Sequence, residues 1–325
     1  MGTYLVTGAA GFIGSRVAEQ LLMRGDRVVG VDNLNDAYDV RLKEWRLARL
    51  LPRPGFQFER RDIAERAACA ALFERDVAYD GVINLAARAG VRQSVENPWV
   101  YNQTNADGTL NLLTECVRNR VGKFVLASTS SLYGGDHPQP YGETLPTERP
   151  LSPYAASKKA AEVMCYTYHY LYGIDVTILR YFTVYGPAGR PDMSLFRFVQ
   201  WISERKPVTV FGDGSQSRDF TFVDDVARGT IAGLRPLGYE IINLGSDQPV
   251  VLADAIRLVE QLVGEQAVLQ HVPRHPADVP ATWADIRKAG RLLEWRPEYD
   301  FRAGVAALVA WYQENREWAR ELRTD

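Results

Sequence analysis

VTGAAGFIGSRV, residues 6–17, places three glycines between an apolar run and the start of a helical pattern. Gly8, Gly11 and Gly14 are each three residues apart. In such a turn the first glycine permits the tight bend and the second lets the backbone approach a pyrophosphate. The third lets the helix pack closely on the sheet, so that the helix N-terminus faces the phosphates. With a strand before it and a helix after it, this segment predicts a dinucleotide-binding unit.

Acidic residues beyond the glycines indicate which dinucleotide is bound. Asp32 ends the second predicted strand, where a carboxylate accepts hydrogen bonds from the adenosine ribose hydroxyls. The same carboxylate repels a 2′-phosphate, so the predicted cofactor is NAD. Asp62 and Ile63 are predicted to end the third strand and to border the adenine.

The first half of the chain alternates short apolar runs with helical patterns. The predicted strands are residues 3–8, 27–32, 56–62, 81–87, 123–129 and 175–182. The predicted helices lie near residues 13–24, 41–51, 64–75, 100–119 and 154–172. Strands separated by helices predict an α/β fold with a Rossmann-type, doubly wound parallel sheet.

After residue 182 the alternation loosens into Gly- and Pro-rich loops between further helices. These helices are predicted near residues 193–204, 224–234, 252–263 and 302–318. We expect residues 1–180, joined by parts of 218–245, to form the NAD-binding domain. Residues 181–325 are expected to form a smaller, partly discontinuous C-terminal α/β substrate domain. Because ligands of open α/β sheets bind beyond the strand carboxyl ends, the junction should lie there.

Composition narrows the classes of partner. The chain has 325 residues, 46% hydrophobic and 24% charged, with a formal net charge of −2. This balance argues against a nucleic-acid partner, and no apolar run approaches the roughly 18 residues that span a bilayer. The three cysteines and four histidines are spaced for neither disulfides nor metal ligands, so no metal site is expected. A cytoplasmic location is predicted.

LSPYAASKKAAE, residues 151–162, places Tyr154 four residues before Lys158 at the start of a predicted helix. Four residues are about one helical turn, so both side chains share a face. Alone this spacing is weak evidence, but the fifth predicted strand also ends in Thr129, Ser130 and Ser131. A tyrosine has an ordinary pKa of about 10. A nearby ammonium and a positively charged nicotinamide ring would both lower it, which would make Tyr154 a general base.

Together, the glycine motif, the threonine ending the fifth strand and the Tyr-Lys pair resemble the extended short-chain dehydrogenase/reductase family, also called the NAD-dependent epimerase/dehydratase family. Within it, the chain most closely resembles the UDP-glucuronate 4-epimerases. That resemblance rests on five long segments, at residues 32–50, 89–98, 128–135, 180–193 and 217–225.

This resemblance implies C4 epimerisation of a UDP-hexuronic acid through a transient 4-keto intermediate, by a homodimer joined through helices 100–119 and 154–172. The implied catalytic residues are Thr129, Tyr154 and Lys158. The implied cofactor-binding residues are Gly8, Gly11, Phe12, Ile13, Gly14, Asp32, Asn33, Asp62, Ile63, Leu85, Ala86, Ala87, Asn105, Tyr154 and Lys158. The implied substrate-binding residues are Arg92, Ser94, Ser130, Ser131, Thr183, Arg190, Val210, Phe211, Arg218 and Asp278.

One position departs from the resemblance. Related 4-epimerases often carry an arginine three residues before the acid that matches Asp278, and here that position is His275. Arg274 lies next to it and is the alternative ligand for the diphosphate.

Other activities remain open at the same residues. A UDP-glucose 4-epimerase would use the same three catalytic groups. Sugar 4,6-dehydratases and uronate decarboxylases resemble the family but carry carboxyl groups just after the threonine, where this chain has Ser130 and Ser131. A non-catalytic NAD-binding regulator is disfavoured because such proteins usually lose the tyrosine or the lysine, and this chain keeps both.

Overall fold

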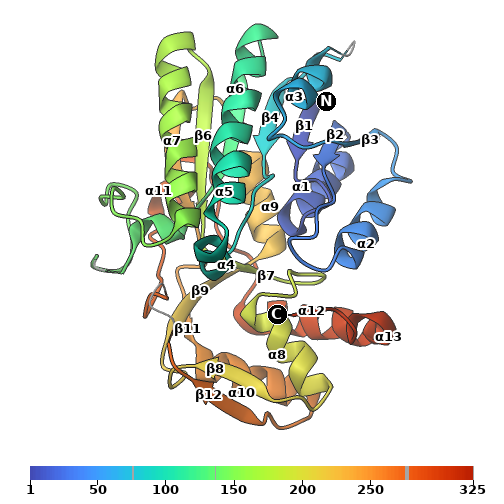
Figure 1. Ribbon diagram of the computed structural model, residues 1–325, viewed down its shortest axis with the longest axis vertical. Helices are drawn as coiled ribbons and strands as arrows, with labels where there is room; N and C mark the ends of the chain where they lie inside the picture. The colour runs from blue at the N-terminus through green and yellow to red at the C-terminus, as the bar shows by residue number, and fades with distance from the viewer. Residues whose placement is uncertain (75–76, 136, 275–277, 325) are drawn as a thin grey trace.

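The computed structural model describes residues 1–74, 77–135, 137–274 and 278–324, and within them a large parallel sheet forms the centre of the molecule (Figure 1). Its seven strands lie in the order β10-β6-β5-β4-β1-β2-β3. They are β1 (Thr3–Thr7), β2 (Arg27–Asp32), β3 (Phe56–Arg60), β4 (Gly81–Asn84), β5 (Lys123–Thr129), β6 (Asp175–Tyr181) and β10 (Tyr239–Leu244). The strand order reverses beside β1, which is the topological switch point of a Rossmann-type sheet. The predicted doubly wound fold is confirmed.

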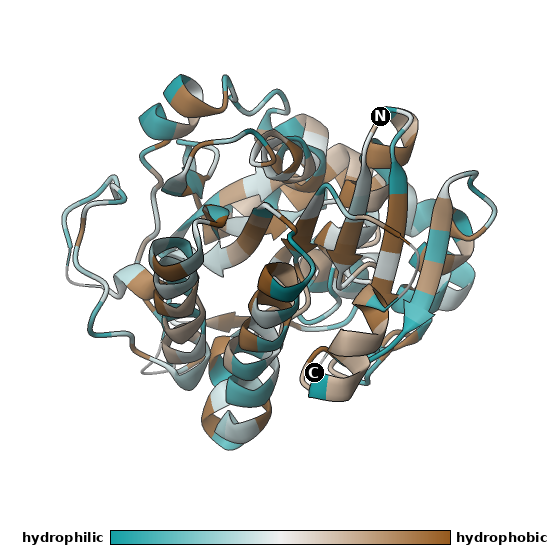
Figure 2. Cartoon of the chain, turned by 90° about the horizontal axis from the view of Figure 1, so that it is seen from above, coloured by the Kyte–Doolittle hydropathy of each residue, from teal (hydrophilic) through white to brown (hydrophobic). Residues whose placement is uncertain are grey.

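Helices cover both faces of this sheet because its strands are apolar on both sides. On one face lie α1 (Phe12–Met23), α2 (Arg41–Leu50), α9 (Val223–Ala232) and α11 (Arg287–Leu292). On the other lie α3 (Arg66–Phe73), α6 (Gly108–Arg118) and α7 (Pro153–Tyr172). Adjacent residues Leu5 and Val6 are both fully buried and belong to opposite cores, as the two-residue period of a strand requires. Figure 2 shows the hydrophobic residues concentrated in the central strands.

Local signals set the limits of α7, the helix that carries Tyr154 and Lys158. Ser152 caps its N-terminus by accepting a hydrogen bond from the Ala155 amide, and Pro153 occupies the first turn. Gly173 ends the helix in the left-handed region, with φ of 69°. Because the helix begins immediately before Tyr154, both side chains lie in its first two turns.

The helix predicted over residues 100–119 is present, but it is not α-helical throughout: its turns run unbroken from Pro98 to Arg118 and include a π-helical segment. The structure has α4 (Val91–Glu96), α5 (Pro98–Asn102), a π-helical turn (Gln103–Asp107) and then α6. Turns of the π type are often found at functional sites. Here the turn carries Asn105, described below.

The remaining elements form a smaller layer below the carboxyl ends of the large sheet (Figure 1). Its strands are β7 (Thr183–Tyr185), β9 (Ser217–Phe222) and β11 (Pro249–Val251) in one sheet, and β8 (Val208–Phe211) and β12 (Leu269–Val272) in another. Its helices are α8 (Ser194–Ser203), α10 (Leu252–Val263), α12 (Phe301–Glu314) and α13 (Arg316–Ala319), which share a separate apolar core. Across the described ranges, none of the helices is both long and apolar enough to cross a membrane.

Candidate active site

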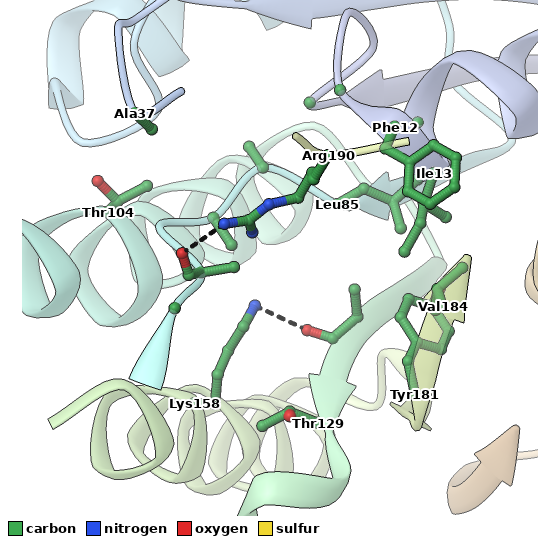
Figure 3. Close-up of a pocket in the computed structure, with 18 of the residues that line it drawn as sticks. Phe12, Ile13, Ala37, Leu85, Thr104, Thr129, Lys158, Tyr181, Val184 and Arg190 are labelled. Atoms are coloured by element: carbon green, nitrogen blue, oxygen red, sulfur yellow. Dashed lines mark hydrogen bonds between the residues drawn. The ribbon is translucent and has the colours of Figure 1, made fainter. Parts of the chain in front are cut away.

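A cavity of about 340 Å³ opens at the carboxyl ends of the large sheet, where residues of the smaller layer also reach it (Figure 3). It brings together most of the residues that the sequence singled out. They are Gly8, Gly11, Phe12, Ile13, Gly14, Asp32, Asn33, Asp62, Ile63, Leu85, Ala86, Ala87, Thr129, Ser130, Ser131, Tyr154, Lys158, Thr183 and Arg190.

The glycine-rich turn leaves no room for side chains, which is what a close-lying pyrophosphate requires. Gly8 has a φ of +68°, and a Cβ on it would lie 2.8 Å from the Ala86 amide nitrogen. A Cβ on Gly14 would overlap the carbonyl oxygen of Gly8. Gly11 is the N-cap residue of α1, and the first residues of that helix, Phe12 to Gly14, line the cavity. The amides in the first turn of a helix have no partner within it and can bind an anion. The cradle therefore fits the diphosphate of NAD.

At the adenosine end, Asp32 is held by its own loop and accompanied by a buried cation. Its Oδ1 accepts a hydrogen bond of 2.8 Å from the Leu34 amide. Lys43 of α2 lies 3.6 Å from the same carboxylate and donates a 3.1 Å hydrogen bond to Asn35. Burial lowers the pKa of Lys43. Lys43 and Asn35 both line the cavity, but neither was predicted, because Lys43 lies in the ordinary amphipathic pattern of α2 and Asn35 in the loop after β2.

Asp62 was predicted to end the third strand, but it lies beyond the end of that strand. β3 stops at Arg60, and Asp62 lies in the following turn, where its Oδ1 accepts from the Ala64 amide at 2.9 Å. Its other oxygen accepts a 2.7 Å hydrogen bond from Asn33. This contact ties the loops after β2 and β3 together at the predicted adenine edge.

Thr129, Tyr154 and Lys158 meet where β5 ends beside the first turns of α7. Lys158 is buried, and its Nζ donates a 2.8 Å hydrogen bond to the carbonyl of Ala127 on β5 (Figure 3). Thr129 Oγ1 accepts from the Ser131 amide at 3.1 Å, which fixes the threonine hydroxyl at the head of the following 3₁₀ turn. The structure therefore places a phenol, a hydroxyl and an ammonium at one end of the cavity.

The electrostatics of Tyr154 differ from expectation. Burial raises its pKa, while a hydrogen bond with Thr129 and the charge of Arg190 lower it less strongly. Burial also lowers the pKa of Lys158 to about 8, against the opposing effect of Glu162. In the protein alone desolvation outweighs the charge of Arg190 and the hydrogen bond with Thr129, so a further positive charge, such as an oxidised nicotinamide ring, is needed to favour the phenolate.

Arg190 approaches the cavity from the segment that precedes α8. Its guanidinium pairs with Asp192 at 2.6 Å and donates a 3.0 Å hydrogen bond to the carbonyl of Ala89 (Figure 3). Because Asp192 satisfies only part of the guanidinium, Arg190 keeps donors for an anionic ligand. Arg190 thereby connects the loop after β4 to the smaller layer.

Asn105 does not line the cavity, although the resemblance implied a cofactor contact. Its side chain is buried, accepting from the Arg88 amide at 2.9 Å and donating to Ser157 Oγ at 2.9 Å. Through these bonds the π-helical turn holds the loop after β4 against α7.

A second group of predicted substrate residues lies outside this cavity. Arg92 forms an ion pair with Asp278, and its guanidinium lies 3.6 Å from the ring centroid of Phe211. Arg218 donates to the carbonyl of Ser217 at 2.8 Å, and burial lowers its pKa. The ion pair joins α4 to the segment after β12.

Three further expectations concern residues near this second group. Ser94 is buried, donates to the Val91 carbonyl of its own helix at 2.6 Å, and is not among the residues that line the cavity. Val210 is packed in the core of the smaller layer. Arg274 pairs with Asp213 at 2.9 Å, and the alternative residue, His275, lies outside the described residues.

Comparisons with known proteins identify relatives of this chain in both sequence and structure. Residues 4–245 match the model of the NAD dependent epimerase/dehydratase family. A UDP-glucuronate 4-epimerase from Thermodesulfobacterium geofontis is 56% identical, over 99% of this chain and 100% of that protein. The structure is similar to a UDP-glucuronic acid 4-epimerase from Bacillus cereus in complex with UDP-glucuronic acid and NAD, with a TM-score of 0.91 at 38% identity, covering 96% and 99% of the two chains. It is also similar to a UDP-glucose 4-epimerase from Thermotoga maritima, with a TM-score of 0.89 at 30% identity, covering 97% and 99%.

Proposed function

Because the chain belongs to the NAD-dependent epimerase/dehydratase family, we propose that it epimerises UDP-glucuronate at C4 to UDP-galacturonate. One observation favours epimerisation over the reactions of the sugar 4,6-dehydratases and the uronate decarboxylases. The residues that follow Thr129 into the cavity are Ser130 and Ser131, so no carboxyl group stands there to act as acid or base.

The residues at the end of β5 and in the first turns of α7 provide the proton chemistry in this proposal. Tyr154 accepts the proton of the C4 hydroxyl, and Thr129 hydrogen-bonds the same oxygen. Lys158 stabilises the phenolate by its charge and is held in place by the Ala127 carbonyl. Gly8, Gly11, Gly14 and Asp32 would hold NAD, and its nicotinamide would supply a hydride acceptor and donor for C4 of the sugar.

In this proposal the smaller layer contains most of the residues that bind the diphosphate and the base of the nucleotide sugar. Arg190 and Arg218 bind the diphosphate together with the segment at Asp278, and Phe211 lies beside the base. Asp278 is paired with Arg92. A diphosphate that enters the site therefore competes with the Asp278 carboxylate for the guanidinium of Arg92. Residues 1–180 with parts of 218–245 then hold NAD, and residues 181–325 hold the UDP-sugar.

A neutral-sugar epimerase is the second candidate, because the structure is also similar to the Thermotoga maritima UDP-glucose 4-epimerase. The deciding experiment incubates the holoenzyme separately with UDP-glucuronate and UDP-glucose and resolves the products by chromatography. We expect UDP-galacturonate from the first and no UDP-galactose from the second. Conversion of UDP-glucose at an equal or higher kcat/KM would overturn the assignment of the substrate.

The 4-keto intermediate of a glucuronate has its ketone β to the C5 carboxylate and is prone to lose carbon dioxide. The enzyme must therefore hold the carboxylate near the carbonyl plane. We assign this role to the hydroxyls of Ser130, Ser131 and Thr183, which line the cavity. Ser130→Ala and Thr183→Val are expected to raise the ratio of UDP-pentose to epimer by about tenfold, the effect of losing about one hydrogen bond.

The control for this product ratio is Ser203→Ala, because the Ser203 hydroxyl is buried outside the cavity. Its product ratio should equal that of the wild type. An unchanged ratio in both cavity variants would remove the assigned role of these hydroxyls.

We also propose that the protein is a homodimer joined through α6 and α7. The support is an exposed apolar strip along α7, where Val163 is 52% exposed and Tyr170 is 76% exposed. These two residues are seven apart and share a helix face, and apolar patches of this kind mark interaction sites. All three cysteines are free and buried, which fits the reducing cytoplasm that we propose as the location.

The double variant Val163→Arg/Tyr170→Arg is expected to convert the dimer into a monomer, because it buries two unpaired charges in the interface. Light scattering after size-exclusion chromatography measures the mass. Val268→Arg is the control, since Val268 is 63% exposed on the smaller layer, and it should stay dimeric. A monomeric wild type would contradict the proposed assembly.

A further inference from the structure

A buried carboxylate lies one helical turn beyond Lys158 and has no part in the chemistry described above. Glu162 of α7 is 2% exposed. Its Oε1 accepts hydrogen bonds from Ser128 Oγ at 2.6 Å and from Arg180 Nε at 3.0 Å. Its Oε2 accepts from Arg180 Nη2 at 2.8 Å, which completes a bidentate pair between α7 and β6.

The pair belongs to a network that continues across the sheet. Arg180 Nη1 donates to the Tyr133 hydroxyl at 3.1 Å, and that hydroxyl donates to Asn243 Oδ1 at 2.7 Å. Tyr133 ends the 3₁₀ turn that begins at Ser130, and Asn243 lies on β10. Such a network holds one arrangement, because an unpaired buried member is costly.

Glu162 and Lys158 contact consecutive residues of one strand. Lys158 binds the carbonyl of Ala127, Glu162 binds the hydroxyl of Ser128, and the next residue is Thr129. The four-residue spacing of the two side chains on α7 matches these neighbouring positions on β5. Figure 3 shows Lys158 extending from α7 toward β5, with Thr129 on the same strand. The Glu162 contacts therefore set the register of the helix against the strand at the reacting end.

We propose that Glu162 is a positioning residue for the epimerisation, which fixes Lys158 and Thr129 relative to each other and supplies the counter-charge that keeps Lys158 an ammonium. This inference rests on the proposed function of the same site.

The charges around the pair support this role. On α7, Lys159 lies 4.0 Å from Glu162, and the Cys165 thiol is a further neighbour, with a pKa that burial raises. Arg180 faces Glu162 from β6, and the hydroxyls of Tyr133 and Tyr239 have pKa values raised by burial. Glu143 accepts a 3.5 Å hydrogen bond from Arg180 through its main-chain carbonyl, and burial raises the pKa of its carboxyl group. Cys116 of α6 interacts with the Cys165 thiol. Of all these groups, Glu162 is the main one that raises the pKa of Lys158 against burial, which lowers it to about 8.

The direction of the pH effect follows from these signs. Lys158 loses its proton as the pH rises through its pKa. Replacing the Glu162 carboxylate by an amide lowers that pKa further, because the ammonium loses the main nearby charge that raises its pKa against burial. The loss of charge on Lys158 moves to lower pH, and the Tyr154 phenolate is less stabilised.

Glu162→Gln in the holoenzyme is the test. We expect the alkaline limb of the kcat profile to move down by about one pH unit, and the acidic limb to move up, because one nearby charge shifts a pKa by about this much. The KM should stay within about twofold, because uniform binding is unchanged. A merely structural role would lower kcat equally at every pH without moving either limb, and that result would overturn the proposal.

A second readout needs no turnover. Titration of the phenolate absorbance of Tyr154, as the difference between each protein and its Tyr154→Phe counterpart, should show a higher pKa in Glu162→Gln than in the wild type. If the protein proved to act on another sugar, this titration would still decide the role of Glu162. Equal titration curves would overturn the proposal even if the assigned sugar is correct.

Two further variants guard against loss of folding. Glu162→Gln/Arg180→Gln removes both charges, leaves no unpaired cation and should still show a downward shift of the alkaline limb. Glu115→Gln is the matched control, because Glu115 is also a buried helical carboxylate, paired with Arg118 at 2.8 Å outside the cavity. Its profile should match the wild type, whereas a shift equal to that of Glu162→Gln would overturn the proposal.

Discussion

Tyr154→Phe is expected to lower the kcat for epimerisation by at least about a thousandfold, within the usual range for loss of a general acid-base group. In the proposed mechanism the phenol takes the C4 hydroxyl proton, and it lines the cavity together with Thr129 and Lys158. Removing the hydroxyl leaves the ring in place, so NAD should remain bound at wild-type occupancy. Chromatography of the products measures the rate, and the nucleotide released on denaturation measures the occupancy.

The control for this variant is Tyr101→Phe. The Tyr101 ring lies edge-on to Tyr154 with 6.2 Å between the centroids, so the substitution tests the effect of altering an adjacent buried phenol. It should keep kcat within about threefold of the wild type, because no proton passes through Tyr101. Full activity of the Tyr154→Phe variant would show that the Tyr154 hydroxyl is not the group that accepts the proton.

Gly14→Ala is expected to weaken NAD binding by about a hundredfold, because a misplacement of about 1 Å at a binding element has effects of this size. The added methyl group overlaps the Gly8 carbonyl, so α1 must move away from the turn that holds the pyrophosphate. Isothermal titration of the NAD-free protein with NAD measures the change. A thermal melt, measured in parallel, should show a lower Tm because the overlap also strains the packing.

Gly122→Ala is the matched control for this substitution. A Cβ on Gly122 meets nothing within 4 Å, so the methyl group should change neither NAD affinity nor Tm. If Gly14→Ala bound NAD as tightly as the control, the close approach of α1 to the turn would not be required for binding.

The sequence was most informative where one local pattern determines one element. The apolar runs at residues 27–32 and 123–129 coincide with β2 and β5, because fully buried parallel strands are apolar on both faces. The helical pattern predicted near residues 154–172 likewise agrees with α7, which runs from Pro153 to Tyr172. Since the glycine motif, Thr129 and the Tyr-Lys pair each follow or begin such an element, their arrival in one cavity could be predicted.

Contacts between distant segments could not be predicted in the same way. β10, at residues 239–244, lies in the segment 218–245 that was expected to join the first domain, but the strand and its place beside β6 were not predicted, because only the tertiary pairing decides them. The π-helical turn around Asn105 depends on bonds to Arg88 and Ser157, so the helical pattern of residues 100–119 gave no sign of it. The pairing of Glu162 with Arg180 spans two elements, and neither residue stood out in its own segment.

The central claim is that one hydrogen leaves C4 of the sugar and returns to the same carbon from the other side, while Tyr154 handles only the hydroxyl proton. The most direct measurement uses UDP-glucuronate with deuterium at C4, in ordinary water, and determines the label in the product by mass spectrometry. The account predicts that UDP-galacturonate keeps the deuterium at C4 in full. Product that carries hydrogen from water at C4 would contradict it, because the carbon would then have been inverted by exchange of a proton with solvent.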